Sequence, residues 1–169
     1  MISEAIKVTR PVTALTRMSA IALMLLSSMT VTWGGPSSPV SADQALRDAH
    51  AIAAMRPNWS VVRCSGDSMD PHFGNNSLAL IDALPYEALR PHMIVVYRDP
   101  SGDLVGHRLI ENTDSGWIAQ AVNNHTPDPY QITEDNYIGV IFGLIHYDGN
   151  NRMVENSLAA LPLVHGKRY

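Results

Sequence analysis

The chain has 169 residues, of which 46% are hydrophobic, and a formal net charge of −4 at pH 7. Its negative charge is concentrated in residues 59–149, where four arginines stand against twelve acidic residues, a balance of 4 − 12 = −8. Such a surface repels a phosphate backbone, so we expect no nucleic acid among the partners. The single cysteine, Cys64, excludes an intrachain disulfide and is expected to be a small buried side chain.

The first 33 residues are typical of a membrane-targeting segment. Residues 1–17 carry three basic residues and one acid, and residues 18–33 form an uncharged, mostly apolar run. This order predicts a single-pass membrane protein with its N-terminus inside and the chain beyond residue 34 translocated. Residues 1–33 are predicted to be a signal anchor.

The alternative is a cleaved signal peptide and an exported domain. The apolar run is shorter than the roughly 20 apolar residues of a stable span, and it contains serine and threonine, which favours a cleavable signal. Against cleavage at residues 40–42, Ser41 and Gln44 have the spacing of a capping box that would open the following helix.

A linker, one domain and a tail are predicted beyond this segment. Residues 34–41 form the linker, residues 42–149 the domain and residues 150–169 the tail. The domain begins with a helix over residues 42–55, where apolar residues recur at helical spacing. Segments rich in Val, Ile and Tyr and bounded by turn residues are predicted as strands: 59–62, 78–81, 93–98, 104–111, 117–122 and 137–147. Residues 99–103 read as a hairpin loop, and the tail contains one short helix near residues 154–161. The sequence predicts a mainly β domain with one short N-terminal helix.

Three short motifs contain the residue types that nucleophilic hydrolysis requires. Residues 64–71 read Cys-Ser-Gly-Asp-Ser-Met-Asp-Pro, residues 106–108 read Gly-His-Arg, and residues 123–128 read Asn-Asn-His-Thr-Pro-Asp. A serine hydroxyl needs an adjacent base to take its proton as it attacks a carbonyl, and a third group usually orients that base. The motifs supply a serine, a histidine and an acid in this order: Ser68, His107 and Asp128.

The positions of the lysines favour histidine as the base. Lys7 precedes the apolar segment and Lys167 stands among the last three residues, so neither suits a buried Ser-Lys pair. Histidine, with an ordinary pKa near 6.5, serves as a base near neutral pH without a large shift. Each candidate also has a structural explanation: Ser68 as a turn serine, His107 as a histidine on a half-buried strand, and Asp128 as a turn former beside proline.

The three motifs resemble those of the signal peptidase I and LexA-like self-cleaving group. Residues 66–71 are similar to its nucleophile box, G-x-S-M-x-P. Residues 105–110 resemble the second box of the endoplasmic-reticulum and archaeal type, which has histidine and arginine where the bacterial and mitochondrial enzymes and the self-cleaving repressors have a lysine base. Residues 119–128 resemble the third box, T-K-G-D-N-N-x-x-x-D, in both asparagines and the final acid, but Ala121 and Val122 replace its Gly-Asp pair. The resemblance spans residues 59–146.

This resemblance implies a coiled β-sheet fold and a membrane-associated serine endopeptidase that cleaves exported polypeptides after small residues. Ser68 would be the nucleophile, His107 the general base and Asp128 the acid that orients it. The Ser68 backbone N–H would bind the oxyanion, supported by Gly66 and Met69, and Gly66 stands where bacterial relatives have a hydroxyl. The substrate would add as a β-strand near Ser68. The resemblance implies no cofactor.

Two other functions stay open at this point. A non-catalytic module of the same fold would bind exported chains or a partner without cutting, in keeping with the replaced Gly-Asp pair and the lack of a second hydrophobic span. A dedicated processing or self-cleaving protease would have one or few substrates. We expect no metal site, because the six other histidines form no H-x-H or H-x-x-x-H pair, and His125 reads as an exposed loop residue.

Overall fold

The computed structural model describes residues 40–149 and 155–169. The predicted membrane segment, residues 1–33, and residues 34–39 of the predicted linker lie outside the described residues. The elements in chain order are α2 (Ala42–Ala53), β1 (Trp59–Gly66), β2 (Ser77–Asp82), the 3₁₀ helix η1 (Tyr86–Ala88), β3 (Ile94–Arg98), β4 (Leu104–Thr113), β5 (Gly116–Gln120), β6 (Tyr137–His146), α3 (Glu155–Ala159) and β7 (Leu163–Gly166). The prediction of a mainly β domain is confirmed. In the part of the chain so described, no helix is long and apolar enough to cross a membrane.

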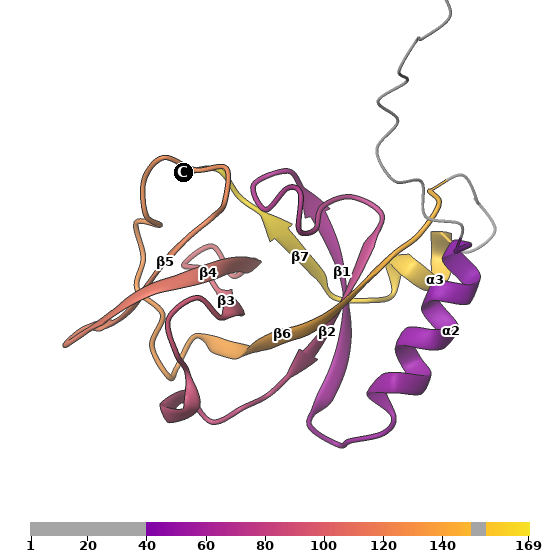
Figure 1. Cartoon of the computed structure of the whole chain (residues 1–169), viewed down its shortest axis with the longest axis horizontal. Helices are drawn as coiled ribbons and strands as arrows, with labels where there is room; N and C mark the ends of the chain where they lie inside the picture. Colours follow the sequence, from indigo (N-terminus) through magenta and orange to yellow (C-terminus); the bar gives the residue numbers. More distant parts are fainter. Residues whose placement is uncertain (1–39, 150–154) are drawn as a thin grey trace, which may run out of the picture. The chain divides into compact units, whose positions relative to one another are not determined.

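Six strands close into a barrel and a seventh lies beside it. Hydrogen-bonded neighbours follow the order β3-β6-β2-β1-β7-β4-β5, and an additional pairing of β3 with β4 closes the ring. Strand β7 is parallel to both of its neighbours, β1 and β4, whereas the other pairs are antiparallel. The second half of β4 pairs with β5, and Figure 1 shows this hairpin at the end of the sheet away from α2.

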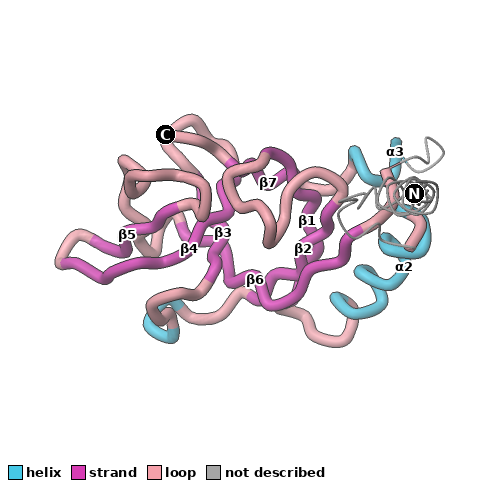
Figure 2. Tube along the Cα trace, turned by 45° about the horizontal axis from the view of Figure 1, so that its top comes forward, coloured by secondary structure: helices cyan, strands magenta, loops and turns pink. Residues whose placement is uncertain are grey.

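Helix α2 begins at a side-chain cap and buries a face of small residues. The Ser41 Oγ accepts a hydrogen bond from the Gln44 amide at 3.2 Å, which satisfies one of the free N–H groups of the first turn. The Gln44 side chain does not return to Ser41 as a full capping box requires, because it bonds Asp48 instead. The buried face consists of three alanines, which let the helix pack closely on β1 and β2: Ala42, Ala45 and Ala49. Figure 2 shows α2 and α3 on the same side of the sheet.

Alternation along the strands divides the apolar residues between the two faces of the barrel wall. In β2 every second residue, Leu78 and Leu80, packs in the cluster with α2, and the residues between them, Ala79 and Ile81, pack in the barrel core. The barrel core also contains Val62, Cys64, Met69, Phe73, Val96, Ala121 and Val164. Because this core includes residues of the turn that follows β1, the packing extends to the Ser68 motif.

The six predicted strands and the predicted helix over residues 42–55 correspond to β1 to β6 and α2, with shifts at their ends. Residues 150–169, however, were assigned to a tail outside the β domain, and this assignment is wrong for the described part. Residues 155–159 form α3, as expected, but Leu163–Gly166 forms β7 in the barrel wall. A four-residue strand has too short a pattern to be recognised locally, and its partners lie far away in the sequence.

Candidate active site

Ser68 lies in the tight turn that follows β1. Two of its side chains, Met69 and Phe73, are buried in the barrel core and fix this turn to it. A backbone hydrogen bond from the His72 amide to the Met69 carbonyl, at 2.8 Å, closes it. Met69, predicted to support the site, thus holds the turn through packing.

Gly66 ends β1 in a backbone conformation that favours glycine. Its φ is +92°, and a Cβ at this position would lie 2.5 Å from the carbonyl oxygen of Gly166. The Gly66 amide donates to Asn75 Oδ1 at 3.3 Å, so this predicted supporting residue shapes the turn and does not offer a free donor. The Ser68 amide has no hydrogen-bond partner among residues 40–149 and 155–169, and it is the donor available to a ligand.

His107 and Asp128 complete a chain of polar contacts that begins at Ser68. His107 lies in β4, and its Nε2 is 3.2 Å from Ser68 Oγ. Its Nδ1 is 2.6 Å from Asp128 Oδ2. Asp128 follows β5 and is fixed by a 2.8 Å hydrogen bond from its amide to the Ala119 carbonyl. The structure therefore brings the three residues that the sequence suggested into one hydrogen-bonded chain, and the side chains of His107 and Asp128 are shielded from solvent.

Tyr97 is a fourth member of this chain that sequence reasoning missed. Its hydroxyl donates to Asp128 Oδ2 at 2.9 Å, the same oxygen that faces His107, and its side chain is fully buried. Burial, together with the charge of Asp128, raises the pKa of Tyr97 far above its usual range. The hydroxyl therefore keeps its proton and remains a donor. The other carboxylate oxygen, Asp128 Oδ1, is buried and has no hydrogen-bond partner in the described part of the chain.

The two asparagines of the third motif hold neighbouring segments in place. The Asn123 amide donates to the Ser68 carbonyl at 2.8 Å, and its side chain donates to the Asp67 carbonyl at 2.7 Å. Asn124 donates through its side chain to the Lys167 carbonyl at 3.3 Å. Asn123 thus fixes the turn that carries Ser68, and Asn124 fixes the segment after β7.

Residues 166–169 lie against the site, which the sequence did not suggest. A Cβ built on Gly166 would lie 2.7 Å from Ser68 Oγ. The ring of Tyr169 stands edge-on to His107, with 6.2 Å between ring centroids. Between them, Lys167 and Arg168 make ion pairs with acids around the site, and no local pattern distinguishes these residues from an ordinary charged tail.

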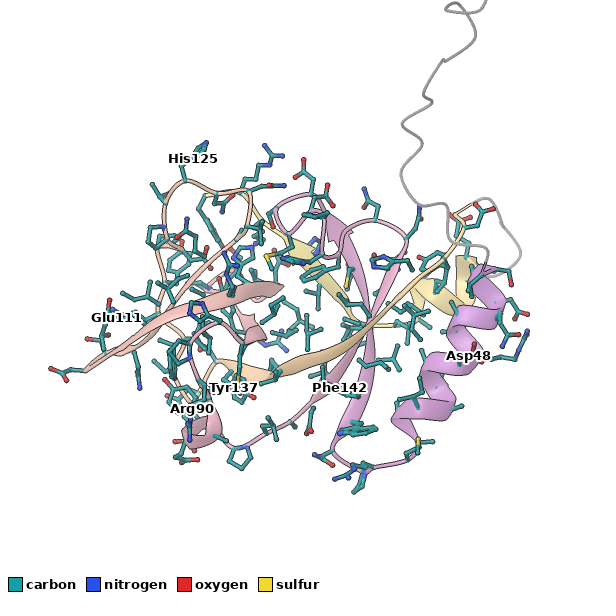
Figure 3. All side chains as sticks on the ribbon, viewed as in Figure 1. Asp48, Arg90, Glu111, His125, Tyr137 and Phe142 are labelled. Carbon is teal, nitrogen blue, oxygen red and sulfur yellow. The ribbon has the colours of Figure 1, made fainter. Side chains whose placement is uncertain are left out.

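Other residues considered from the sequence lie away from this chemistry. His125, close to Asp128 in sequence, is exposed and points outward from its loop in Figure 3. Cys64 is buried in the barrel core, and burial raises the pKa of its thiol to about 12, as expected for an inert side chain. Lys167 Nζ is held at 2.6 Å from Asp99 and 2.8 Å from Asp103. Among residues 40–149 and 155–169, no group of His, Cys, Asp and Glu could hold a metal ion.

The arrangement has the parts needed for acyl transfer: a hydroxyl, a base within reach of it, an acid on the far nitrogen of that base, and a free amide beside the hydroxyl. A comparison with protein-family models found no match for this chain, and a comparison with curated proteins found none. The chemistry of the site itself is therefore the ground for a functional conclusion.

Proposed function

We propose that this protein is a serine endopeptidase of the signal peptidase type that cleaves exported polypeptides. The observation that carries the proposal is the continuous chain of contacts from Ser68 Oγ to His107 Nε2, at 3.2 Å, and from His107 Nδ1 to Asp128 Oδ2, at 2.6 Å. These residues are far apart in sequence, and a purely structural role requires no such order of hydroxyl, imidazole and carboxylate.

The geometry supports the following division of roles. Ser68 Oγ attacks the scissile carbonyl carbon as His107 Nε2 takes its proton, and His107 then protonates the leaving amine. A water molecule, activated by His107, hydrolyses the resulting ester. Asp128 keeps the proton of neutral His107 on Nδ1 and stabilises the imidazolium that forms. The Ser68 amide, which has no partner among the described residues, is positioned to donate to the oxyanion, a contribution of about 10²-fold or more in comparable sites.

The signal peptidase and LexA-like coiled β-sheet fold is part of this proposal. A β-barrel with the serine on the turn after its first strand and the histidine inside a later strand is compatible with it. The apolar run over residues 18–33, behind a basic segment, supports a membrane-anchored enzyme that meets its substrates on the outer side.

One observation favours a second candidate, a non-catalytic module that binds polypeptides. Ser68 and His107 are both 0% exposed, so neither is reachable from solvent in this conformation. A domain that holds a peptide without cutting it does not need an accessible hydroxyl.

The full-length chain and its Ser68→Ala variant, in lipid or detergent, distinguish the two functions. The substrate is a peptide with a small-x-small site, and mass spectrometry reports cleavage. We expect cleavage by the unaltered chain and none by the variant, with both folded by circular dichroism. Equal cleavage in both would remove Ser68 from the mechanism, and binding without cleavage by the folded unaltered chain would favour the binding module.

A further inference from the structure

The candidate nucleophile is covered by the protein's own chain. Ser68 and His107 are 0% exposed, although a hydrolase that acts on other polypeptides must present both to its substrate. One segment in contact with both is residues 163–169, through Gly166 at Ser68 and Tyr169 at His107. Hydrolysis of another polypeptide therefore requires that a covering segment can leave, and residues 163–169 are the candidate.

Strand β7 lies between the two strands that deliver the reacting residues. It pairs with β1 in parallel register, from Arg63 with Leu163 to Gly66 with Gly166, and β1 ends two residues before Ser68. On its other side it pairs in parallel with β4 only at residues 104 and 105, just before His107. A polypeptide that binds by strand addition next to Ser68 would use these same backbone groups.

The register places a glycine at the nucleophile. A Cβ on Gly166 would lie 2.7 Å from Ser68 Oγ and 3.3 Å from the Ser68 amide nitrogen, the donor that has no internal partner. Gly166 therefore occupies the place next to the hydroxyl and the proposed oxyanion donor, where a substrate residue would present its carbonyl. No side chain larger than hydrogen fits there without displacement.

The alternate residue of β7, Val164, packs in the barrel core. It is 0% exposed, and its Cγ1 would lie 2.9 Å from a Cβ on Gly106. Val164 and Gly166 share one face of the strand because side chains alternate. His165 lies between them and is only partly buried, with Nδ1 3.3 Å from Ser65 Oγ. The three positions of β7 thus hold an apolar buried residue, a partly exposed residue and a glycine in succession.

Charged contacts fix the residues that follow Gly166. Lys167 Nζ bonds Asp99 at 2.6 Å and Asp103 at 2.8 Å. Arg168 bonds both carboxylate oxygens of Asp67, with Nε 3.0 Å from Oδ1. These acids lie on two loops, Asp67 after β1 and the other two between β3 and β4, so they form a negatively charged rim that holds a basic segment beyond the glycine. We call the contacts of Lys167 and Arg168 with these three acids the latch.

We propose that residues 163–169 are a built-in occupant of the peptide groove, which competes in cis with polypeptide substrates of the pattern apolar-x-Gly followed by basic residues. The statement that the segment competes with substrates rests on the proposed function. Release of the latch frees the groove between β1 and β4, and an external strand of the same pattern takes the place of β7. The segment therefore sets both the specificity of the site and its resting inactivity.

Binding to the full-length chain tests this proposal without requiring chemistry. In a Ser68→Ala background, Lys167→Glu and Arg168→Glu together place two negative charges against the acids of the latch. The matched control reverses two exposed arginines of α2 and the turn after it, Arg47→Glu and Arg56→Glu. The probe is a fluorescein-labelled peptide with the sequence of residues 161–169, and a second peptide carries Gly166→Val.

We expect the probe to bind the latch variant at least tenfold more tightly than the control or the unaltered background, and the Gly166→Val peptide to bind at least tenfold more weakly than the probe. Hydrogen exchange supplies a second measurement on the same proteins. Amides of residues 163–166 should exchange faster in the latch variant, whereas those of β2, another strand of the barrel, should not change. Equal affinity for the probe in all three proteins, or unchanged protection of β7, would show that β7 is a permanent strand of the barrel and would overturn the proposal.

If the protein is not a hydrolase, the result differs from that expected when residues 163–169 do not occupy the groove. With Ser68 restored, the latch variant would bind the peptide but never cut it, and the occupant proposal would survive as a property of a binding module. If hydrolysis is correct, the latch variant should instead show a lower KM at an unchanged kcat, because a competing segment has been weakened.

Discussion

The Nδ1 atom of His107 lies 2.6 Å from Oδ2 of Asp128, and both side chains are shielded from solvent. This contact joins the middle of β4 to the loop after β5, two segments that the hairpin alone would not hold in this way. In such a position the carboxylate fixes which nitrogen of the neutral imidazole carries the proton, and Nε2 is then free to accept from Ser68.

Replacing the acid should stop turnover without unfolding the domain. Asp128→Asn keeps the volume but lets the amide offer a donor to Nδ1, which favours the wrong tautomer of His107. In a serine triad this change costs about 10⁴ in kcat, and we expect a loss of several orders of magnitude here. Asp114→Asn and Asp135→Asn, at exposed positions, serve as controls and should leave kcat unchanged. A near-normal rate in Asp128→Asn would reduce the site to a Ser-His pair.

The hydroxyl of Tyr97 should contribute to the rate through Asp128. Tyr97→Phe removes one donor to Oδ2 and keeps the packing, so we expect kcat to fall about fivefold at an unchanged KM, since one hydrogen bond is worth about 1 kcal/mol. Tyr86→Phe is the matched control. The Tyr86 hydroxyl donates to the backbone carbonyl of Ile132 at 2.8 Å, and this hydrogen bond lies outside the Ser68–His107–Asp128 chain. Both variants should lose about 1 kcal/mol of unfolding free energy, but only Tyr97→Phe should slow turnover. Equal kcat values would assign Tyr97 a structural role alone.

The elements with strong local patterns were predictable. Strands β1 to β6 contain runs of apolar and β-branched residues between turn formers, and α2 has apolar residues at helical spacing. Ser68, His107 and Asp128 could be selected because each stands in a short, unusual motif and because no lysine was suitably placed. Their approach to hydrogen-bond distance is a property of the barrel, which the sequence pattern does not describe.

The parts that could not be predicted depend on pairing between distant segments. Strand β7 has only four residues, and its parallel partner β1 precedes it by about a hundred positions. Lys167 and Arg168 look like a solvated tail until Asp99 and Asp67 are placed beside them. Tyr97 has the pattern of an ordinary strand residue, and only its contact with Asp128 distinguishes it. Local periodicity contains no information on any of these contacts.

The contact between Gly66 and Gly166 should make Gly66→Ala lower the free energy of unfolding by more than the backbone conformation alone explains. Gly66→Ala and Gly102→Ala both place alanine at a positive φ, +92° and +89°, which costs roughly 1–2 kcal/mol in each case. A Cβ at Gly66 also lies 2.5 Å from the Gly166 carbonyl oxygen, whereas a Cβ at Gly102 meets no atom within 4 Å. Urea denaturation should therefore show an additional loss of about 1–3 kcal/mol for Gly66→Ala. Equal losses would mean that β7 does not lie against β1 at this point in solution.

The latch should be insensitive to pH across the neutral range and should weaken only in acid or in strong base. Hydrogen bonds from Arg168 hold the pKa of Asp67 below its usual range. For Asp99, burial acts in the opposite direction, but the hydrogen bonds from Lys167 and the Asp103 amide outweigh it, and the pKa is also lowered. Hydrogen bonds to Asp103 and Asp99 raise the pKa of Lys167.

The direction of each pKa shift sets the pH range over which these groups stay charged. A carboxylate with a lowered pKa stabilises the folded contact above its unfolded value, about 3.9, and this stabilisation is lost as the pH falls through the folded pKa. A lysine with a raised pKa stabilises below its unfolded value, about 10.4, and the contribution is lost as the pH rises through the folded pKa. Asp67, Asp99 and Lys167 therefore stay charged from about pH 5 to pH 9.

The ring protons of Tyr169 report on the latch by NMR, because the ring stands edge-on to His107 and Tyr130. Their chemical shifts should be constant between pH 5 and pH 9 and should move to random-coil values only well below pH 4, as Asp67 and Asp99, whose pKa values are lowered, become protonated. Asp67→Asn should already show part of this change at pH 7, because it removes the charge that Arg168 contacts. Release with a midpoint between pH 6 and pH 7 would contradict this account, because neither the carboxylates nor the lysine of the latch would control the segment.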